Sequence, residues 1–359
     1  MSPNNNASNE YDRSTLVSPQ ILPSCESAAS FSNLKVKIHA ITTDTSGSFY
    51  PPTTSIVTSS KSTSIFNVLF PPISLLLWPS LLTVPLLLSG TSENGPTHYS
   101  KLFPTEWYDT PSAYAPKPLG LILGIVAVAV GQVFVILYHF IRIQFGTAQN
   151  VSIQRKGARN YDFWEGVRTQ LCNPEGFGLL IFYLSGTWMG GIMPAAYYSF
   201  EGGIDYWKLT GCLVIQDFVQ YVMHRLEHVV SPEVYKRSHE PHHRFTNPRL
   251  FDAFNGSPPD TILMILIPLY ITAWTIPCNV WTYMAFGSMY ANWLTLIHSE
   301  FPHVWDKAFR TLGLGTPGDH HVHHKFFKYN FGHLFMWSDM IFKTHRYPEN
   351  FLKVFNKEV

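Results

Sequence analysis

Thirteen of the 16 histidines in this chain lie at or after His224, and eight of them fall into three short groups. The first group has the spacing H-x-x-x-H and the other two have H-x-x-H-H; their members are His224 and His228, then His239, His242 and His243, then His320, His323 and His324. Residues three or four apart share one face of a helix, so each group can aim its rings at one point. Imidazole is the commonest protein ligand for iron, copper, nickel and zinc, and eight rings exceed what one ion needs. The spacing therefore predicts two metal ions held close together.

The chemistry that such a site favours is oxidation. An all-imidazole site without an evident carboxylate bridge suits iron, whose redox chemistry can activate dioxygen. The expected reaction breaks an unactivated C–H bond and leaves an alcohol or, if a second hydrogen is removed, an alkene. Each turnover takes two electrons from outside the site. Because the sequence has no HPGG haem-binding stretch and no flavin motif, we expect a separate electron donor.

Two more residues share a helical face with the first histidine group. Asp217, Tyr221, His224 and His228 follow one another at intervals of four, three and four residues. An ionisable residue inside an apolar stretch is costly unless it has a task, so we expect Asp217 to fix the tautomer of a ligating histidine and Tyr221 to support the site beside it. The alternative for Asp217 is a hydrogen bond to a neighbouring helix, and for Tyr221 it is an aromatic anchor at the membrane interface.

Proline and turn residues locate the second and third groups at helix starts. Proline is tolerated only in the first turn of a helix, so Pro241 places His239 at or just before an N-cap. Upstream of His320, the stretch Thr316-Pro317-Gly318-Asp319 predicts a turn with Asp319 as the N-cap. Both groups are therefore well placed to bind a metal but are not rigid alone, and we expect the metals to hold these ends in place.

The three groups, with DFVQYVMHRLEH leading into the first and HHKFFKYNFGHLFMWSDMIFKT following the third, resemble the fatty acid hydroxylase superfamily of membrane di-iron enzymes. The resemblance covers residues 207–347. It implies two non-haem Fe ions, O2, and electrons from NAD(P)H through cytochrome b5 and its reductase. It also implies a ninth ligand, His298, because family members carry an extra histidine in a similar stretch. His303, His321 and His333 receive no assigned role.

The resemblance also narrows the substrate. The spacing of the groups and the stretch Asn330-Phe331-Gly332 are more similar to sterol desaturases and sterol methyl oxidases than to fatty-acyl hydroxylases with a fused haem domain. We expect a sterol or related isoprenoid lipid to be hydroxylated or desaturated, with a fatty-acyl or sphingolipid hydroxylase or desaturase as the alternative. Ser338 and Lys343 depart from the usual closing segment, so no particular subfamily's substrate is transferred.

A zinc peptidase is a remote alternative. The stretch from His224 to His228 fits the H-x-x-E-H signature, in which Glu227 would act as the base. That assignment explains one group and leaves six candidate ligands unused. Two iron ions per chain would support the oxygenase, and one zinc ion the peptidase.

Composition indicates the kind of scaffold. Charged residues make up 14% of the chain, against about 25% in a typical soluble protein, while hydrophobic residues make up 46%. The net charge of +1 and the lack of a basic stripe exclude a nucleic-acid partner. Five apolar segments are candidates for crossing a bilayer: 65–88, 119–141, 177–198, 207–223 and 261–297, the last folding back near Pro277-Cys278-Asn279. The predicted fold is all-α, a polytopic membrane helical bundle with the histidine site at its cytosolic face.

Domain organisation and sidedness follow from the same segments. We expect a disordered Ser/Thr/Asn-rich tail at 1–64, a transmembrane region at 65–206, the catalytic region at 207–347 and a C-terminal tail at 348–359. The loop between the second and third segments is rich in basic residues, which predicts a cytosolic position: Arg142, Arg155, Lys156, Arg159 and Arg168. Counting onward, every histidine group then faces the cytosol. The expected location is the endoplasmic reticulum membrane, crossed several times.

Overall fold

The computed structural model describes residues 65–89, 98–109, 117–145, 151–155, 162–171 and 174–352. Among these residues the regular structure is helical, apart from one isolated bridge between Leu314 and Phe335. The all-α prediction is therefore confirmed. The tail predicted at 1–64 lies outside the described residues, as do residues 353–359 of the predicted C-terminal tail.

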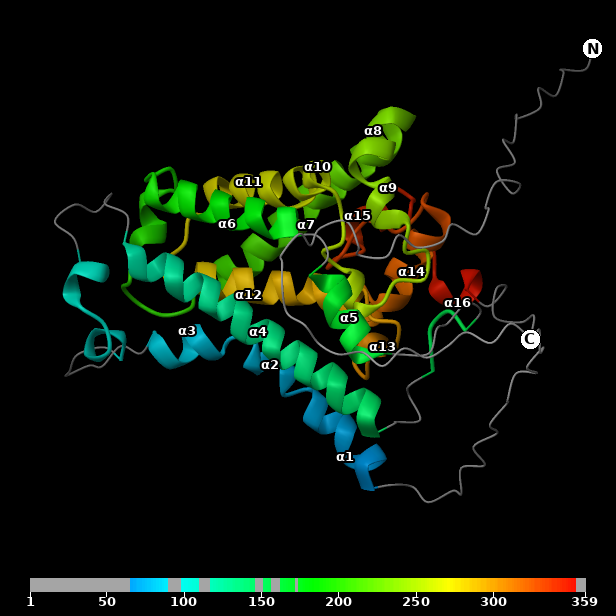
Figure 1. The fold of residues 1–359 in the computed structure, drawn as a ribbon, viewed down its shortest axis with the longest axis horizontal. Coiled ribbons are helices and arrows are strands. Elements are labelled where there is room, and N and C mark those ends of the chain that lie inside the picture. The colour runs from blue at the N-terminus through cyan, green and yellow to red at the C-terminus, as the bar shows by residue number, and fades with distance from the viewer. Residues whose placement is uncertain are drawn as a thin grey trace, which may run out of the picture. The chain divides into compact units, whose positions relative to one another are not determined.

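Two long helices, α4 (Pro118–Phe145) and α12 (Val280–Ile297), pack along each other through the middle of the bundle (Figure 1). Both are apolar along their length, but α12 is buried on nearly every side whereas α4 leaves one face exposed. Their close approach depends on Gly131, because a Cβ atom there would collide with Asn292 and Ser288 of α12. Small residues at helix contacts are typical of membrane bundles, where packing replaces the hydrophobic driving force.

The helix α7 (Tyr206–Val229) carries the first histidine group, and it runs without a break from the apolar segment into His224, as predicted. Asp205 caps its start by accepting hydrogen bonds from the backbone N–H groups of Trp207 and Lys208. On one side it packs against α11 (Ile267–Thr275) and on another against α12. Since a helix rises about 1.5 Å per residue, α7 is about 36 Å long and joins the apolar bundle to the histidine site.

The predicted hairpin within 261–297 is present. After α10 (Pro258–Thr261) and a π-helical turn, η5 (Ile262–Leu266), the chain continues as α11, ends that helix at Thr275 and reverses into α12. Asn279 caps α12 with its side-chain oxygen, which accepts from the Thr282 N–H at 3.0 Å. The turn therefore lies where the Pro277-Cys278-Asn279 stretch predicted it.

Two other apolar segments do not form single continuous helices. Residues 65–88 divide into α1 (Ile65–Ser74), α2 (Leu77–Ser80) and α3 (Thr83–Leu88), as expected from four prolines in this stretch. In the segment 177–198, α6 (Pro174–Met189) ends at a Gly-Gly pair before η3 (Ala195–Tyr198). By length and composition, Pro118–Gln144 is the one described helix able to cross a bilayer by itself, so the predicted set of crossings stays a prediction.

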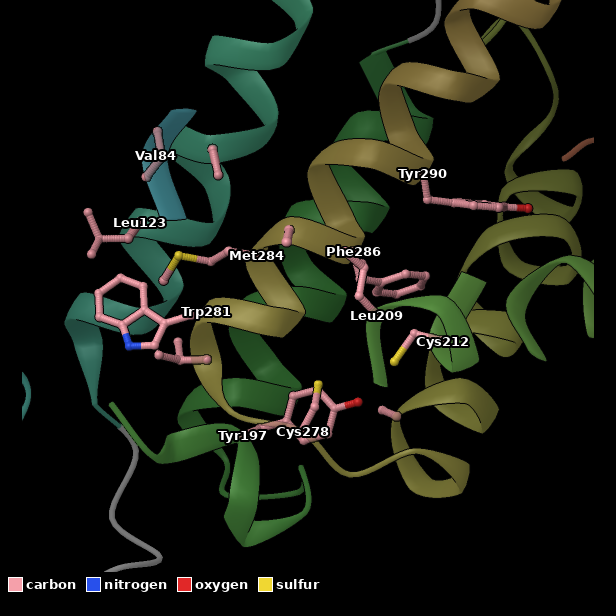
Figure 2. Close-up of a cluster of buried hydrophobic side chains, with 14 of the residues drawn as sticks. Val84, Leu123, Tyr197, Leu209, Cys212, Cys278, Trp281, Met284, Phe286 and Tyr290 are labelled. Carbon is pink, nitrogen blue, oxygen red and sulfur yellow. The ribbon is translucent and has the colours of Figure 1, made fainter. Parts of the chain in front are cut away.

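The larger of two buried apolar clusters lies between α3, α4, α7 and α12 and extends along α12 as far as Ile297, next to His298. Figure 2 shows Trp281 and Met284 of α12 directed toward Leu123 of α4, and Leu209 of α7 beside Phe286 of α12. The indole of Trp281 donates to the Phe200 carbonyl at 3.0 Å, so its polar atom is satisfied although the ring is fully buried. This packing fixes the relative positions of α7 and α12, whose other ends carry His224 and His298.

The remaining helices are short, and most gather around the histidine-bearing end. They are η1 (Tyr99–Lys101), η2 (Thr105–Trp107), α5 (Phe163–Gln170), α8 (Pro232–Ser238), α9 (Glu240–His243), η4 (Leu250–Asp252), α13 (Asp306–Thr311), α14 (Pro317–Phe326), α15 (Trp337–Ile341) and α16 (Pro348–Phe351). Of these, α9 and α14 carry the second and third histidine groups.

Candidate metal centre

Nine histidines form two convergent clusters where α7, α9, α12 and α14 meet. The first cluster contains His224, His228, His239, His243 and His323, and the second contains His242, His298, His320 and His324. Within each cluster, the candidate ligand nitrogens all lie within 4.8 Å of one another. Eight of the nine side chains are buried and His228 is half-buried. The structure thus brings together every residue that the sequence predicted as a metal ligand.

The second and third histidine groups each contribute to both clusters. His242 and His243 are neighbours in sequence yet belong to different clusters, and the same holds for His323 and His324. Consecutive residues on a helix point about 100° apart, so two adjacent histidines can direct one ring into each cluster. The ring of His243 belongs to the first cluster and that of His324 to the second, and their centroids are 4.8 Å apart. The two clusters are therefore adjacent.

Backbone carbonyls determine the tautomers of several rings. The Nδ1 atom of His224 lies 2.8 Å from the Phe331 oxygen, that of His298 lies 2.7 Å from the Leu294 oxygen, and that of His323 lies 2.8 Å from the Tyr329 oxygen. A carbonyl only accepts, so each Nδ1 carries the hydrogen and each Nε2 presents a lone pair. A metal ion is bound by nitrogen atoms that present such lone pairs.

The spacing of the Nε2 atoms fits a metal ion in each cluster. The Nε2 atoms of His323 and His243 are 2.9 Å apart, as are those of His320 and His298. Two imidazole nitrogens bound at right angles, each about 2.1 Å from one ion, lie about 3 Å apart. Without an ion, one nitrogen of each pair can carry a hydrogen and donate it to the other, because no backbone carbonyl fixes the tautomers of His243 and His320. The donor set therefore fits two nitrogen-bound metal ions.

Burial keeps these imidazoles in the form that binds metal. Loss of solvent, and then the neighbouring imidazoles, lowers the pKa values of His239, His320 and His323 well below 6.5. The rings are consequently neutral at physiological pH and need not release a proton before binding an ion.

A carboxylate that the sequence analysis missed contacts one ligand directly. The Oδ1 atom of Asp260 lies 2.7 Å from Nδ1 of His239, and the Oε2 atom of Glu227 lies 3.8 Å from the same nitrogen. Ser257 caps the short helix α10 and accepts from the Asp260 N–H, which fixes the start of that turn. A carboxylate paired with the outer nitrogen of a ligating histidine orients the ring and raises its basicity. The sequence marks Asp260 only by its position directly before the long uncharged segment 261–297, and this position does not identify His239 as its partner.

The expected role of Asp217 is corrected by the structure. Its carboxylate accepts from the backbone N–H groups of His333, Leu334 and Phe335, at 3.2, 2.6 and 3.2 Å, instead of orienting a histidine ring itself. The physical reason is that this turn of the chain brings three donors into a buried place without a strand or helix to satisfy them. The same loop supplies the Phe331 carbonyl that accepts from His224. Asp217 therefore positions His224 indirectly, by holding this loop.

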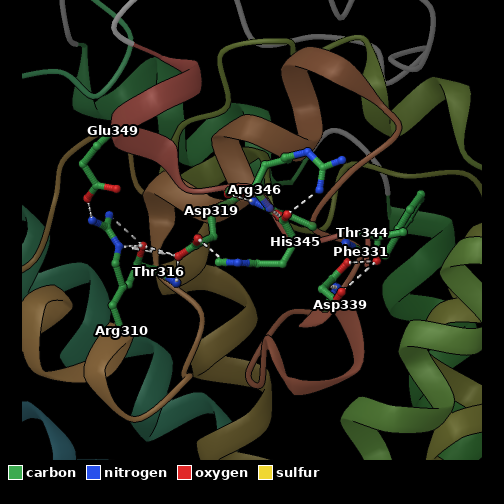
Figure 3. Close-up of polar contacts among 11 residues, drawn as sticks. Arg310, Thr316, Asp319, Phe331, Asp339, Thr344, His345, Arg346 and Glu349 are labelled. Atoms are coloured by element: carbon green, nitrogen blue, oxygen red, sulfur yellow. Dashed lines mark hydrogen bonds and ion pairs between the residues drawn. The ribbon is translucent and has the colours of Figure 1, made fainter. Parts of the chain in front are cut away.

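Asp339 holds the other half of that loop. It accepts from the N–H groups of Phe331 and Gly332 at 3.0 and 2.7 Å and from the Thr344 hydroxyl at 2.6 Å (Figure 3). Tyr221 joins this network, since its hydroxyl lies 3.1 Å from the Thr344 hydroxyl and its side chain is buried. The buried position contradicts the alternative of an interfacial anchor for Tyr221.

The helix starts of the second and third groups are largely as predicted. His239 is the N-cap residue of α9, and Pro241 lies in its first turn, so that prediction is confirmed. The prediction for Asp319 was wrong, because the N-cap of α14 is Thr316 and Pro317 is the first helical residue. Asp319 instead accepts from the backbone and hydroxyl of Thr316 at 3.0 and 2.6 Å, which completes a capping box (Figure 3).

The three histidines without an assigned role, His303, His321 and His333, lie outside the clusters. Both ring nitrogens of His321 have protein partners, Gln154 at 2.9 Å and the Ser299 carbonyl at 3.1 Å. His303 is similarly bound, by Tyr138 and the Leu296 carbonyl. His333 lies between the clusters, with its ring centroid 5.2 Å from His224 and 5.0 Å from His320.

Comparison with known proteins agrees with this geometry. The sequence model of the fatty acid hydroxylase family matches residues 209–344. A protein of Phaeodactylum tricornutum named alternative squalene epoxidase is 61% identical over 289 residues, which cover 79% of this chain and 82% of the relative. A Delta(7)-sterol 5(6)-desaturase of Gibberella zeae is 30% identical over 38% of this chain and 41% of its own length. Lathosterol oxidase of Mus musculus is 32% identical over 40% of this chain and 46% of its own length.

No solved structure shows a significant match to this chain. The family match spans the helices α7 to α15 and so contains all nine clustered histidines. The similarity to the Phaeodactylum protein extends over most of both chains, beyond the histidine region. By these matches, the chain belongs to the fatty acid hydroxylase superfamily.

Proposed function

We propose that this chain is a membrane-bound, non-haem di-iron oxidoreductase that uses O2 to epoxidise squalene. The structural observation that supports it most strongly is the pair of adjacent, buried histidine clusters, which together offer nine neutral imidazoles. The choice of squalene rests on the 61% identity to a relative named alternative squalene epoxidase, 82% of which is covered.

Epoxidation fits the expected substrate class but differs from the two reactions expected from the sequence. Squalene is an isoprenoid hydrocarbon, which agrees with the prediction of a sterol or related isoprenoid. The reaction adds one oxygen atom across a carbon–carbon double bond, and the second oxygen atom of O2 leaves as water after uptake of two electrons and two protons. Hydroxylation and desaturation instead begin at a C–H bond. Epoxidation of an alkene is therefore a third reaction that the same site could carry out.

The residues of this chain have separate tasks in the proposed reaction. The five and four histidines of the two clusters would hold one iron ion each, and bound iron supplies the activation of O2. Asp260 orients His239, and the loop anchored by Asp217 and Asp339 orients His224. The chain carries no haem or flavin motif, so the electrons come from NAD(P)H through cytochrome b5 and its reductase, as in the family that it resembles.

The surroundings of the site support a substrate that arrives from the bilayer. Large apolar side chains are exposed along the bundle, among them Val133 and Leu137 of α4 and Phe182 of α6, of which Phe182 is 78% exposed. Such surfaces are stable against lipid tails and are unfavourable against water. We place the protein in the endoplasmic reticulum membrane, with several crossings and the metal centre on the cytosolic side.

Sterol desaturation is the second candidate, favoured by the identity of about 30% to the Gibberella desaturase. That match covers 41% of the relative, whereas the match to the Phaeodactylum protein covers 82%. The zinc peptidase alternative fits poorly, because it leaves seven clustered histidines unused, three in the same cluster as His224 and His228 and four in the second cluster.

The decisive experiment supplies squalene and O2 labelled with oxygen-18 to the purified protein in lipid nanodiscs, together with cytochrome b5, its reductase and NADH. Mass spectrometry should find squalene that has gained one labelled oxygen atom. A His323→Ala protein is the matched negative control, since its first cluster lacks one ligand. Unchanged squalene, with a parallel sterol incubation losing two hydrogens, would favour the desaturase. One zinc ion per chain without any lipid oxidation would refute both.

A further inference from the structure

One histidine near the two clusters has neither a metal-binding role nor a partner for its ring. His321 and His303, the other two histidines without an assigned role, have protein partners on both ring nitrogens. In contrast, Nδ1 of His333 is buried and has no hydrogen-bond partner among the described residues. Buried polar atoms without a partner are rare in proteins and each asks for an explanation.

The backbone of His333 is held firmly from two sides. Its N–H donates to Oδ1 of Asp217 at 3.2 Å, and its carbonyl accepts from the indole N–H of Trp293 at 3.0 Å. The carbonyl also lies so close to Gly315 that a Cβ atom there would collide with it. With the side chain only 4% exposed, the ring has little freedom to turn toward solvent. The position between the clusters is therefore built into the fold.

The ring faces one histidine of each cluster. Its centroid lies 5.2 Å from the ring of His224, in the first cluster, and 5.0 Å from the ring of His320, in the second. Its nitrogens are nevertheless not members of either set whose ligand atoms lie within 4.8 Å of one another. His333 thus stands beside both proposed metal positions without completing the ligand set of either.

We propose that His333 hydrogen-bonds a small ligand held between the two clusters, such as water, dioxygen or an anion of similar size. A neutral imidazole offers one donor and one acceptor, and an unpartnered ring nitrogen buried at this place can bind a polar atom there. This inference rests on the proposed two-metal site. It adds a residue that touches the bound ligand and leaves the nine metal ligands unchanged.

Azide binding to the iron-loaded protein tests the proposal without any substrate or turnover. Azide gives an absorption band when it binds ferric iron, so its affinity is measured by titration, and iron per chain is measured on the same samples. The variants are His333→Ala, which removes the hydrogen bond, and His333→Gln, which keeps a donor of similar reach. His98→Ala, at an exposed position outside the bundle core, is the matched control.

The proposal expects two iron ions per chain in every variant. Azide affinity should fall about tenfold or more in His333→Ala, as for loss of one hydrogen bond to a charged group. It should recover in part in His333→Gln and stay unchanged in His98→Ala. If His333→Ala does not fold, the comparison of His333→Gln with His333→Leu carries the same test.

Two results would overturn the proposal. Unchanged azide affinity with full iron content would show that His333 does not touch the ligand. Loss of one iron ion in the His333 variants would instead make His333 a metal ligand. A wild-type protein that binds no iron would remove the proposed function itself, so the two failures are distinguishable.

Discussion

Replacing Asp260 tests how strongly the metal centre depends on a residue that binds no metal. Its Oδ1 atom is 2.7 Å from the outer nitrogen of His239, and of the two histidine clusters His239 belongs to the first. Removing the carboxylate that supports a ligating histidine typically weakens metal binding about 10- to 100-fold, or about 1.4 to 2.8 kcal/mol. Asp260→Ala should therefore release one of two metal ions at chelator concentrations that leave both in the wild-type protein.

The isosteric change separates hydrogen bonding from charge. Asp260→Asn removes the negative charge but keeps a carbonyl oxygen that can accept from His239, so it should lose less affinity than Asp260→Ala. The effect of the alanine change is limited by Glu227, whose Oε2 atom is 3.8 Å from the same nitrogen and offers a weaker substitute. Metal content after graded chelation is the assay, and thermal unfolding in detergent checks that each variant is folded. Equal retention of both ions in Asp260→Ala and wild type would refute the reasoning.

Three further perturbations have defined outcomes. Asp217→Ala leaves three buried N–H groups without an acceptor, at about 1–3 kcal/mol each, so its unfolding temperature should fall sharply; an unchanged temperature would contradict the loop-anchoring role. Burial lowers the pKa of ligands such as His320 well below 6.5, so below pH 6.5 this imidazole binds more protons in the unfolded chain than in the folded one. The free energy of unfolding of the wild type should therefore fall, as pH falls, relative to that of His320→Gln; a difference that stays constant from pH 7.5 to 5 would contradict neutral burial. Gly131→Ala should destabilise the α4–α12 contact by about 1–3 kcal/mol, whereas Gly124→Ala, whose Cβ would lie 4.0 Å from Met284, should be tolerated in the same unfolding assay.

The sequence predicted which grouped histidines come together, because their spacing is a local property of helices. His224 and His228 share a face by helical periodicity, and Pro241 alone was enough to locate the start of α9. The hairpin at Asn279 was predictable for a similar reason, since an uncharged segment of that length must fold back.

The supporting contacts were not predictable because they join residues far apart in the chain. Asp260 meets His239 across 21 residues, and the Phe331 carbonyl meets His224 across 107. Nothing in the local pattern around Asp217 distinguishes a carboxylate that binds an imidazole from one that binds three backbone N–H groups. That distinction depends on where the loop 331–335 passes, which is a property of the whole fold.

The iron content of the purified protein tests the central claim most directly. Two adjacent clusters of five and four imidazoles predict two iron ions per chain, measured by mass spectrometry of the metal against protein concentration after expression in iron-supplemented medium. Replacing His298, which belongs to the second cluster alone, by alanine should reduce the content toward one ion per chain. A single zinc ion per wild-type chain, or two iron ions retained without His298, would contradict the proposed two-metal centre.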